Sequence, residues 1–420
     1  MESTNGGTKA AAAAGGSGKS GSDFNAHDMV FIGNFVKDII IWENSDDTVE
    51  TRTAMGGSVT YGPLAVAEYG GKARVISSIG PDPEIESFLQ CLQEKGVNLE
   101  GVQRKDQGKN TSYQLRYDKS RVRTLTLKEK GFPVSFNHVL RQLDQIPHSN
   151  TNNNEAEQKN SSPFALLFVP IAAELDEGMI IGVVQHLRQQ QEQQHFVVGI
   201  DIQGYLRDFE GEVVTTRPAH KMQQKLQKLS DAAAVTFLKA EYGEALSILK
   251  AAGKAGEGTE EEESWSPAGC AEELQRRFGF PIVSVTMGPN GSWLCTEALG
   301  TVFVPTYKPD VVVDETGCGD TFLACTICEL LHLREGKRHN EPFGQEVLEA
   351  VKVGSCAASF LVEDKGPKGF ASRAKVLQRI AAGVTQGKEQ KPKTLTRYTP
   401  STRRRKQQQQ TTENGQTESN

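Results

Sequence analysis

The sequence predicts an α/β fold in which a mostly parallel sheet is covered by helices on both faces. Two observations predict it: short β-rich runs recur along the chain, and helical patterns follow several of them. The expected strands are Met29–Ile32, Ala73–Ile79, Ala165–Val169, Phe196–Ile200, Ala234–Phe237, Ile282–Thr286 and Trp293–Thr296. The expected helices are Pro63–Tyr69, Glu84–Glu94, Gly178–Leu187, Lys239–Ala251 and Glu272–Phe278. Strands that alternate with helices are joined by right-handed crossovers, which make neighbouring strands parallel.

Two segments depart from this rhythm and predict a second, smaller sheet. Ile39–Thr53 and Tyr113–Leu127 alternate polar and apolar residues, which is typical of an antiparallel sheet with one wet face. Ligands of doubly wound proteins bind beyond the carboxyl ends of the strands, so a small sheet at that edge would act as a lid.

The length and the polar stretches predict one core domain rather than several. The chain has 420 residues, of which 37% are hydrophobic. We expect a domain over residues 28–384, a disordered amino-terminal tail over 1–27 and a disordered basic tail over 385–420. Three stretches without an apolar period, at about 148–163, 189–195 and 252–269, are expected to be surface insertions in loops or helix ends.

Charge, cysteines and apolar runs limit the function classes. The net charge is −6, but residues 388–420 carry eight Lys and Arg against three Glu, a net +5 that leaves −11 for the rest. A core of that charge disfavours nucleic acid as a partner. The longest apolar run, Phe164–Ala173, is too short for a membrane span, and seven scattered cysteines suit a reducing compartment. We expect a cytoplasmic protein; Arg403–Lys406 also permits nuclear import.

The most informative motif is a valine run followed by two glycines and a helix. Val311–Val313 reads as a strand, Gly317 and Gly319 follow with Cys318 between them, and a helix is expected from Asp320 to Leu333. Glycines before a helix leave backbone N–H groups free to bind an anion. Asp320 either caps this helix or takes a proton from an attacking hydroxyl group, and the pattern alone does not decide between the two roles.

Several motifs in order resemble the ribokinase (PfkB-type) family of carbohydrate kinases. Residues 314–322, DETGCGDTF, resemble the family's D-T-T-G-A-G-D-x-F, and Gly33 to Asp38 resemble its G-x-x-x-x-D. Residues 56–61, GGSVTY, resemble its G-G-x-x-x-N, with Tyr61 in place of Asn. The resemblance runs from about Val30 to about Gly383. It implies a ribokinase-like, doubly wound, mainly parallel sheet with a small antiparallel β lid.

The resemblance assigns the residues of phosphoryl transfer and of acceptor binding. Asp320 would be the catalytic base, and the backbone of Gly317, Cys318 and Gly319 would form the anion hole. The expected acceptor-binding residues are Asn34, Asp38, Gly56, Gly57 and Tyr61. Two of these have simpler explanations: Asn34 as an exposed strand-end residue, and Tyr61 as the first apolar residue of its helix. Arg207 is a further candidate for a substrate or phosphate contact, with a surface salt bridge as the alternative.

The donor and metal residues also follow from the resemblance. Residues 286–291, TMGPNG, resemble the family's T-x-G-x-x-G loop, so Thr286, Gly288 and Gly291 would bind ATP. The small residues Ala357 and Ala358 would line the adenine pocket, although helix packing explains them equally. Glu241 and Glu244 resemble the N-x-x-E element that orders Mg²⁺, with Glu241 in place of Asn; two solvated glutamates on a surface helix are the alternative.

Together these residues predict an ATP- and Mg²⁺-dependent kinase that phosphorylates a hydroxyl group of a sugar or polyol. Within that family, the sequence most resembles the inositol-kinase-like branch. A nucleoside kinase and a non-catalytic nucleotide-binding scaffold of the same fold are the alternatives. The expected partners are ATP and a small acceptor, without nucleic acid or membrane. The chain either forms a homodimer through the lid, as relatives do, or seals that edge with Lys119 and Arg121.

Two short motifs and one thiol are predicted to carry no chemistry of their own. Residues 15–20, GGSGKS, end like a P-loop but lack its first glycine and a preceding strand. Cys325 and Cys328 have metal-binding spacing inside an apolar helix, which favours buried packing cysteines. Cys318 is expected to be a small residue that fits the anion hole, with a reactive thiol as the alternative.

Overall fold

The computed structural model describes residues 28–44, 47–120, 123–146, 163–190, 196–249, 265–337 and 341–387. Both expected tails lie outside these residues, apart from 385–387. The insertions at 148–163 and 189–195 also lie largely outside them. Part of the third insertion is described and is helical: α8 (Pro267–Phe278) begins within it, and the Ser266 hydroxyl caps that helix by accepting the Gly269 N–H at 3.0 Å.

The main sheet confirms the predicted α/β class. Its order in the described residues is β15-β14-β13-β12-β9-β8-β1-β4-β5, and every pair from β13 to β5 is parallel. The strands are β1 (Asp28–Ile32), β4 (Lys72–Ile79), β5 (Val102–Arg104), β8 (Phe164–Phe168), β9 (Phe196–Asp201), β12 (Phe237–Glu241), β13 (Ile282–Thr286), β14 (Ser292–Thr296) and β15 (Gly300–Val304). The chain order reverses at β1, between β8 and β4, which makes this the switch point of the sheet.

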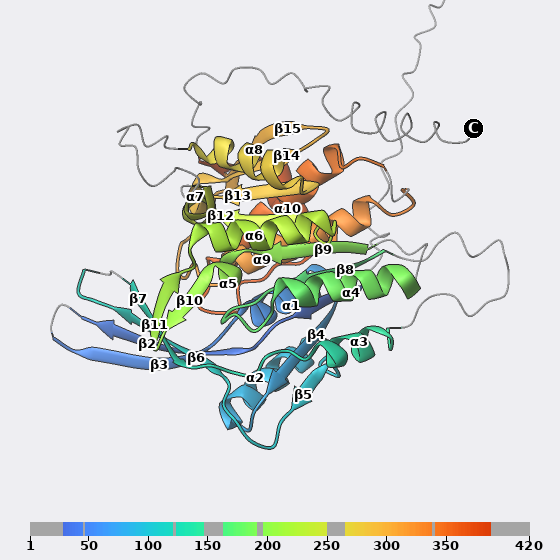
Figure 1. The fold of residues 1–420 in the computed structure, drawn as a ribbon. Helices are drawn as coiled ribbons and strands as arrows, with labels where there is room; N and C mark the ends of the chain where they lie inside the picture. The colour runs from blue at the N-terminus through green and yellow to red at the C-terminus, as the bar shows by residue number, and fades with distance from the viewer. Residues whose placement is uncertain are drawn as a thin grey trace, which may run out of the picture. The chain divides into compact units, whose positions relative to one another are not determined.

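Helices cover both faces of this sheet (Figure 1). Alternate residues of β1 show how the two cores form: Met29 and Phe31 pack into one, while Val30 and Ile32 pack into the other. The first core holds α1 (Ser58–Tyr69), α2 (Pro83–Glu94), α9 (Cys318–Leu333), α10 (Gln345–Leu361) and α11 (Arg373–Ala382). The second holds α3 (Phe136–Leu143), α4 (Glu177–Gln190), α6 (Ala219–Asp231), α7 (Tyr242–Leu249) and α8. No helix in the described ranges is long and apolar enough to cross a bilayer.

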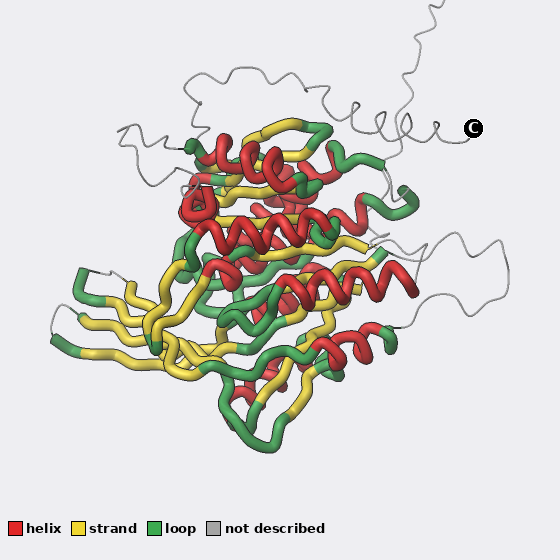
Figure 2. Tube along the Cα trace, viewed as in Figure 1, coloured by secondary structure: helices red, strands yellow, loops and turns green. Residues whose placement is uncertain are grey.

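A second sheet forms the lid, and it is larger than the sequence predicted. Its order is β10-β11-β7-β6-β2-β3. Its strands are the yellow ones that project to the left in Figure 2. The strands are β2 (Val36–Glu43), β3 (Val49–Gly56), β6 (Thr111–Tyr117), β7 (Arg123–Glu129), β10 (Arg207–Glu210) and β11 (Val213–Thr216). The pairing is antiparallel except between β2 and β6, which are parallel, and the β10–β11 hairpin was not predicted. Because β3 and β10 are the edges, Lys119, in the turn after β6, does not seal an edge strand.

Two expected elements differ from the structure. Val311–Val313 is not a strand: it is an exposed loop, and the Val313 N–H donates to the Val362 carbonyl at the end of α10 instead of to a neighbouring strand. Lys239, predicted to begin a helix, lies on β12, and the helix α7 begins only at Tyr242. The strand expected at Ala234–Phe237 instead spans Phe237–Glu241, because the buried residues continue through Lys239 to Ala240.

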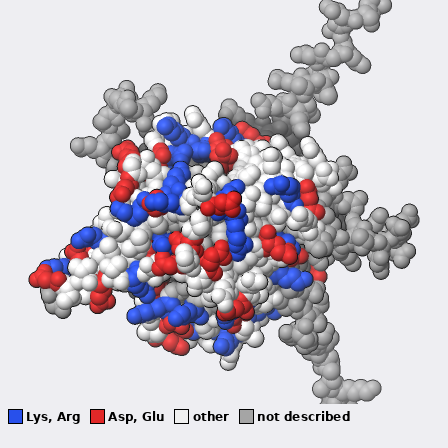
Figure 3. Space-filling view, turned by 90° about the horizontal axis from the view of Figure 1, so that it is seen from below, with Lys and Arg blue, Asp and Glu red and all other residues white. Residues whose placement is uncertain are grey.

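Charged side chains are mixed on the face seen from below in Figure 3. Lys and Arg alternate there with Asp and Glu, and neither sign gathers into one large patch. Nucleic-acid surfaces instead concentrate positive charge along the path of the phosphate backbone. This face therefore offers no such surface.

Candidate active site

The first turn of α9 has the backbone geometry that an anion site requires. Gly317 caps the helix with a φ of 81°, in the left-handed region that favours glycine, and the Thr321 N–H is bonded to the Gly317 carbonyl at 2.9 Å. Helix geometry leaves the N–H groups of Gly319 and Asp320 without acceptors in the helix itself. The Tyr61 ring lies against Gly317, where a Cβ atom would come within 2.0 Å of it. The ring of Tyr61 therefore fixes the turn from the side of α1.

Asp320 lies at this turn with a raised pKa. Burial and the nearby Asp201 carboxylate raise the pKa of Asp320 to about 6, while the Ser58 hydroxyl, Lys239 and Arg207 oppose the shift. The Ser58 side chain hydrogen-bonds to the Asp320 carboxylate and comes from the start of α1. A carboxylate with this pKa is ionised at neutral pH, yet it is a stronger base than an exposed aspartate.

A buried ion pair beside Asp320 was not predicted from the sequence. The Lys239 Nζ lies 2.6 Å from the Asp201 Oδ2, and both side chains are more than nine-tenths buried. The same Nζ lies 3.0 Å from the position of a Cβ on Gly319, so the positive charge borders the anion site. Asp201 is the last residue of β9, and Lys239 lies directly beside it in the parallel strand β12. The carboxyl end of β9 is where a doubly wound sheet binds its ligands. The only sequence signal for this pair was that Asp201 directly follows a predicted strand, Phe196–Ile200.

The lid strands bring Asp38 and a glycine pair to the same place. The Asp38 carboxylate covers Gly56, where a Cβ would lie 2.0 Å from Oδ2, so only glycine fits there. Gly57 has a φ of 87° and caps α1. Burial raises the pKa of Tyr61 far above its ordinary value, and Asp314, Asp38 and Asp320 add to the shift. Tyr61 is therefore surrounded by three acidic groups on the acceptor side of α9.

Asn34, expected to contact the acceptor, is held by the protein itself. It is 2% exposed; its side-chain amide donates to the Phe132 carbonyl at 2.6 Å and its Oδ1 accepts from the Ser77 hydroxyl at 3.5 Å. Its backbone N–H donates to Glu174 Oε1 at 3.1 Å. The buried Glu174 carboxylate also accepts the N–H of Ile171 and of Ala172. It thus ties the turn after β1 to the turn after β8.

Arg207 stands where the main sheet meets the lid. Its guanidinium donates to the Ile171 carbonyl at 3.0 Å and lies over the Tyr113 ring, 5.3 Å from its centroid. Its charge also lowers the pKa of Asp320. No salt bridge of Arg207 occurs among the described residues, so the surface salt bridge is not its role in this structure.

A cavity of about 230 Å³ extends from the anion site between β13, β14 and α10. Its walls include most of the residues expected to bind the donor, which are Thr286, Gly288, Gly291 and Ala358, and they also include Cys318 and Gly319. Tyr307, Pro309, Phe322 and Val362 supply apolar surface. The Ser292 hydroxyl also borders the cavity; the side chain is 2% exposed and its oxygen has no hydrogen-bond partner in the described part of the chain.

One expectation about this cavity is wrong, and one is supported. Ala357 is 3% exposed and packs in the first core, so it does not line the cavity as expected; only its neighbour Ala358 does. Burial, followed by Glu315, Asp314 and Asp320, raises the pKa of the Cys318 thiol to about 12. The thiol therefore stays protonated, which favours the small-residue interpretation over a reactive cysteine.

The start of α7 carries the residues that resemble the metal element. The Glu244 Oε2 accepts the Glu241 N–H at 2.8 Å, and the exposed Glu241 carboxylate accepts the Gly243 N–H at 2.7 Å. Burial and Asp201 raise the pKa of Glu244. The described ranges contain no cluster of three or more metal-ligating side chains. One or two carboxylates nonetheless suit Mg²⁺, which takes its other ligands from water and phosphate oxygens, so these residues fit the metal.

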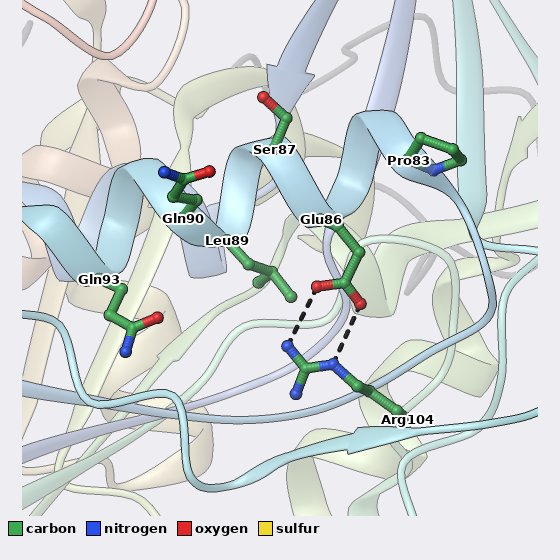
Figure 4. Close-up of a pocket in the computed structure, with 7 residues that line it drawn as sticks. All are labelled: Pro83, Glu86, Ser87, Leu89, Gln90, Gln93 and Arg104. Carbon is green, nitrogen blue, oxygen red and sulfur yellow. Dashed lines mark hydrogen bonds and ion pairs between the residues drawn. The ribbon is translucent and has the colours of Figure 1, made fainter.

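A broader hollow of about 470 Å³ lies on the outer surface of α2, away from these groups (Figure 4). Its polar rim is the ion pair between Glu86 and Arg104, with bonds of 3.0 and 3.1 Å. Both side chains are about half exposed. None of the residues that line this hollow is a buried ionisable group like Asp320 at α9, so the hollow is a poorer candidate for an active site.

Comparison with known proteins agrees with the geometry. Residues 201–373, which contain Asp201, Lys239, Glu244 and Asp320, match the pfkB family carbohydrate kinase. The chain resembles the PfkB-type carbohydrate kinases. The match indicates a phosphotransferase of the carbohydrate-kinase class, as predicted.

Solved structures of the ribokinase family share the fold. A ribokinase from Giardia lamblia has a TM-score of 0.62 at 16% identity, covering 86% of this chain and 100% of that one. An Arabidopsis thaliana ribokinase complexed with ribose and ATP has a TM-score of 0.56 at 17% identity, covering 85% and 99%. A pyrophosphate-dependent kinase complexed with a pyrophosphate analog and myo-inositol has a TM-score of 0.56 at 19% identity, covering 83% and 99%. At these identities the likeness supports the PfkB-type fold alone.

Proposed function

We propose that the chain transfers the γ-phosphate of ATP to a hydroxyl group of a sugar or polyol, with myo-inositol as the first acceptor to test. The observation that carries this proposal is the continuity of the site. Cys318 and Gly319, in the first turn of α9, are part of the cavity wall, and the next residue is Asp320 with its raised pKa. A donor in the cavity and an acceptor beside Tyr61 would meet at this turn.

The residues of the chain divide the chemistry between them. Asp320 accepts the proton of the attacking hydroxyl group, and the Ser58 hydroxyl holds its carboxylate in place. The open N–H groups of α9 and the Lys239 ammonium face the position of developing negative charge. Bound ATP would supply the phosphoryl group, and Mg²⁺ held by Glu244 would offset phosphate charge. The lid, which carries Asp38, would exclude water.

The cavity favours a nucleotide donor over pyrophosphate. Phosphate needs only the glycine turn and positive charge, whereas the apolar walls of Tyr307, Phe322 and Val362 extend beyond that turn. Such a slot suits a purine base. The unpartnered Ser292 hydroxyl would give the base or its ribose a hydrogen-bonding group, which relieves the cost of burying that hydroxyl.

The acceptor side favours a compact polyhydroxylated ring. Asp38 and the Arg207 guanidinium offer acceptor and donor groups to ring hydroxyls. Tyr61 replaces the amide that ribokinase-like relatives present, which disfavours ribose and fructose phosphate. Asn34 then serves as a positioning residue through its bonds to Phe132 and Ser77.

The catalytic role of Asp320 is tested by Asp320→Asn. We expect turnover to fall by about three orders of magnitude or more, because the amide cannot accept the proton, with ATP binding nearly unchanged. Asp310→Asn is the matched control, since that side chain lies in the preceding loop and is 93% exposed. Turnover of Asp320→Asn within tenfold of the unmodified protein would show that another group is the base.

The donor and acceptor are tested together in one panel. Thermal unfolding with Mg–ATP or Mg–pyrophosphate is measured first, followed by donor consumption with myo-inositol, ribose, fructose phosphate and adenosine. Stabilisation by ATP and rapid consumption with myo-inositol would support the proposal. Rapid use of adenosine would identify a nucleoside kinase. Stabilisation by ATP without consumption with any of the four acceptors would support the non-catalytic nucleotide-binding scaffold, and no stabilisation by either donor would contradict both interpretations.

A further inference from the structure

Arg52 lies on the face of the lid that looks toward the acceptor site. In the pairing of β2 with β3, Arg52 is directly opposite Ile40, and Asp38 is opposite Ala54. Residues directly opposite each other point to the same face of a sheet, and so do residues two apart on one strand. Arg52 therefore shares its face with Asp38, which lies on the acceptor side.

The Arg52 guanidinium reaches from the lid to the loop before α9. Its Nη2 lies 3.9 Å from the Asp314 Oδ2, and its centre lies 4.9 Å from the centroid of the Trp42 ring. Its charge also lowers the pKa of Tyr61, against the three acidic groups that raise it. The contact with Asp314 thus bridges the lid and the loop that carries the anion site.

Asp314 is a fixed point in that loop. Its Oδ1 accepts the Thr316 N–H at 3.0 Å, and its Oδ2 accepts the Gly366 N–H at 3.1 Å. The first bond stabilises the loop itself, and the second ties it to the segment that follows α10. Gly317 caps α9 three residues after Asp314. A group that pulls on Asp314 consequently acts on the turn that contains Asp320.

The Arg52 contact is incomplete in the observed arrangement. The Nε of Arg52 is buried and has no acceptor in the described residues, and its ion pair with Asp314 is at the limit of contact distance. A planar guanidinium pairs best with a carboxylate through two parallel bonds of about 2.8 Å. A small further closure of the lid would let Nε and Nη2 form that pair.

We propose that Arg52 is a positioning residue that latches the closed lid to Asp314 and thereby fixes the α9 turn during phosphoryl transfer. The inference rests on the proposed function for its kinetic consequence, but the latch itself is a contact within the chain. Closure that reaches the α9 turn directly would couple acceptor binding to the placement of Asp320.

The variants are Arg52→Gln, which removes the charge, and Arg52→Lys, which keeps it without the planar fork. Arg116→Gln is the matched control, because Arg116 is also a lid arginine and, among the described residues, its ion pair is with Glu43 on the lid itself. Hydrogen exchange of β2, β3 and residues 308–317 is measured with and without Mg–ATP. We expect faster exchange of these segments in Arg52→Gln, partial recovery in Arg52→Lys and no change in Arg116→Gln.

Kinetics provides the second measurement, with the acceptor that the panel identifies. In Arg52→Gln we expect kcat/KM for the acceptor to fall by about tenfold to a hundredfold and a larger share of ATP to be hydrolysed without transfer. Arg52→Gln and Asp314→Asn together should cost less than the product of their separate effects. The latch would be overturned if the effects of Arg52→Gln and Asp314→Asn on kcat/KM simply multiplied in the double variant. It would also be overturned if Arg52→Gln matched Arg116→Gln in hydrogen exchange and kinetics. Exchange needs no acceptor, so failure of the proposed function would leave this test intact.

Discussion

The Asp320 carboxylate is placed between opposing charges, and this placement sets the pH at which it can act. Burial and Asp201 raise its pKa to about 6, whereas the Lys239 ammonium, which is paired with Asp201, lowers it. The base must be ionised to accept a proton, so kcat/KM should rise with pH through about 6 and level off above it.

Asp201→Asn tests that electrostatic account. The substitution removes a negative charge that raises the pKa of Asp320 and leaves the Lys239 charge in place, so the pKa must fall. We expect the acidic limb of the kcat/KM profile to move to lower pH. Asp231→Asn, a surface substitution on α6, is the control and should leave the limb unchanged. A limb that stays in place or moves to higher pH would show that Asp201 does not act on the base.

The individual site residues were predictable only where a short motif contained them. Gly317, Gly319 and Asp320 lie within four consecutive residues, and the pattern indicated both a backbone role for the glycines and a role for the carboxylate. The Lys239–Asp201 pair joins residues 38 apart in the chain. A contact between residues so far apart leaves no pattern in the local sequence. The local pattern instead predicts a helix that starts at Lys239, which lies on β12 in the structure. Likewise, the packing of Tyr61 on Gly317 depends on the docking of α1 against α9.

At the scale of elements, the close packing of α9 on α10 shapes the donor cavity. Gly354 of α10 faces α9, where a Cβ would lie 2.0 Å from the Thr326 Oγ1 and 2.4 Å from the Phe322 carbonyl oxygen. Only glycine permits this approach. Ala358, one turn later on α10, and Phe322 of α9 both line the cavity. The width of the cavity therefore depends on the distance between these two helices.

Gly354→Ala should separate the two helices. We expect a loss of stability of about 1–3 kcal/mol from overpacking, and a several-fold rise in KM for ATP because Ala358 moves. Gly178→Ala on α4 is the control: a Cβ there meets only the Asp176 carboxylate at 3.3 Å, far from the cavity. Denaturant unfolding and the ATP dependence of the rate measure the two effects. An unchanged KM alongside lower stability would separate cavity shape from helix packing.

Elements were predictable where a buried face gave a clear period. Ile282–Thr286 was predicted at its observed bounds because every residue before Thr286 is buried. The apolar run Val311–Val313 predicted a strand, yet all three side chains are more than 40% exposed and no strand lies beside them in the described part of the chain. The β10–β11 hairpin was missed because its residues pair with β7, far away in the sequence.

At the scale of the whole molecule, the sequence predicted one core domain whose ligands bind beyond the carboxyl ends of the strands. The carboxyl-terminal boundary was less accurate, because polar composition alone placed residues 385–387 in the tail. Thr385 and Gln386 instead form β17, paired with β16 (Thr306–Tyr307). Composition cannot reveal a two-residue strand whose partner lies about 80 positions earlier in the chain.

The segment 384–387 completes the outer wall of the donor cavity. The Gln386 side chain lines it together with Tyr307, and the Lys308 N–H donates to the Val384 carbonyl at 3.1 Å. Gly387 packs on Asn290, in the turn between β13 and β14, where a Cβ would lie 2.8 Å from the carbonyl oxygen. The last described residues of the chain therefore join two loops that the donor would touch.

Two truncations separate this wall from the rest of the chain. A chain that ends at Gly387 keeps every contact described above, so we expect its KM for ATP and its melting temperature to match the full-length protein. A chain that ends at Gly383 retains the cap of α11 but loses β17, so KM for ATP should rise several-fold with kcat at saturating ATP nearly unchanged, because Asp320 and the α9 turn are untouched. Equal KM values for the two truncations would exclude β17 from the donor site. A raised KM already in the chain that ends at Gly387 would assign part of donor binding to residues 388–420.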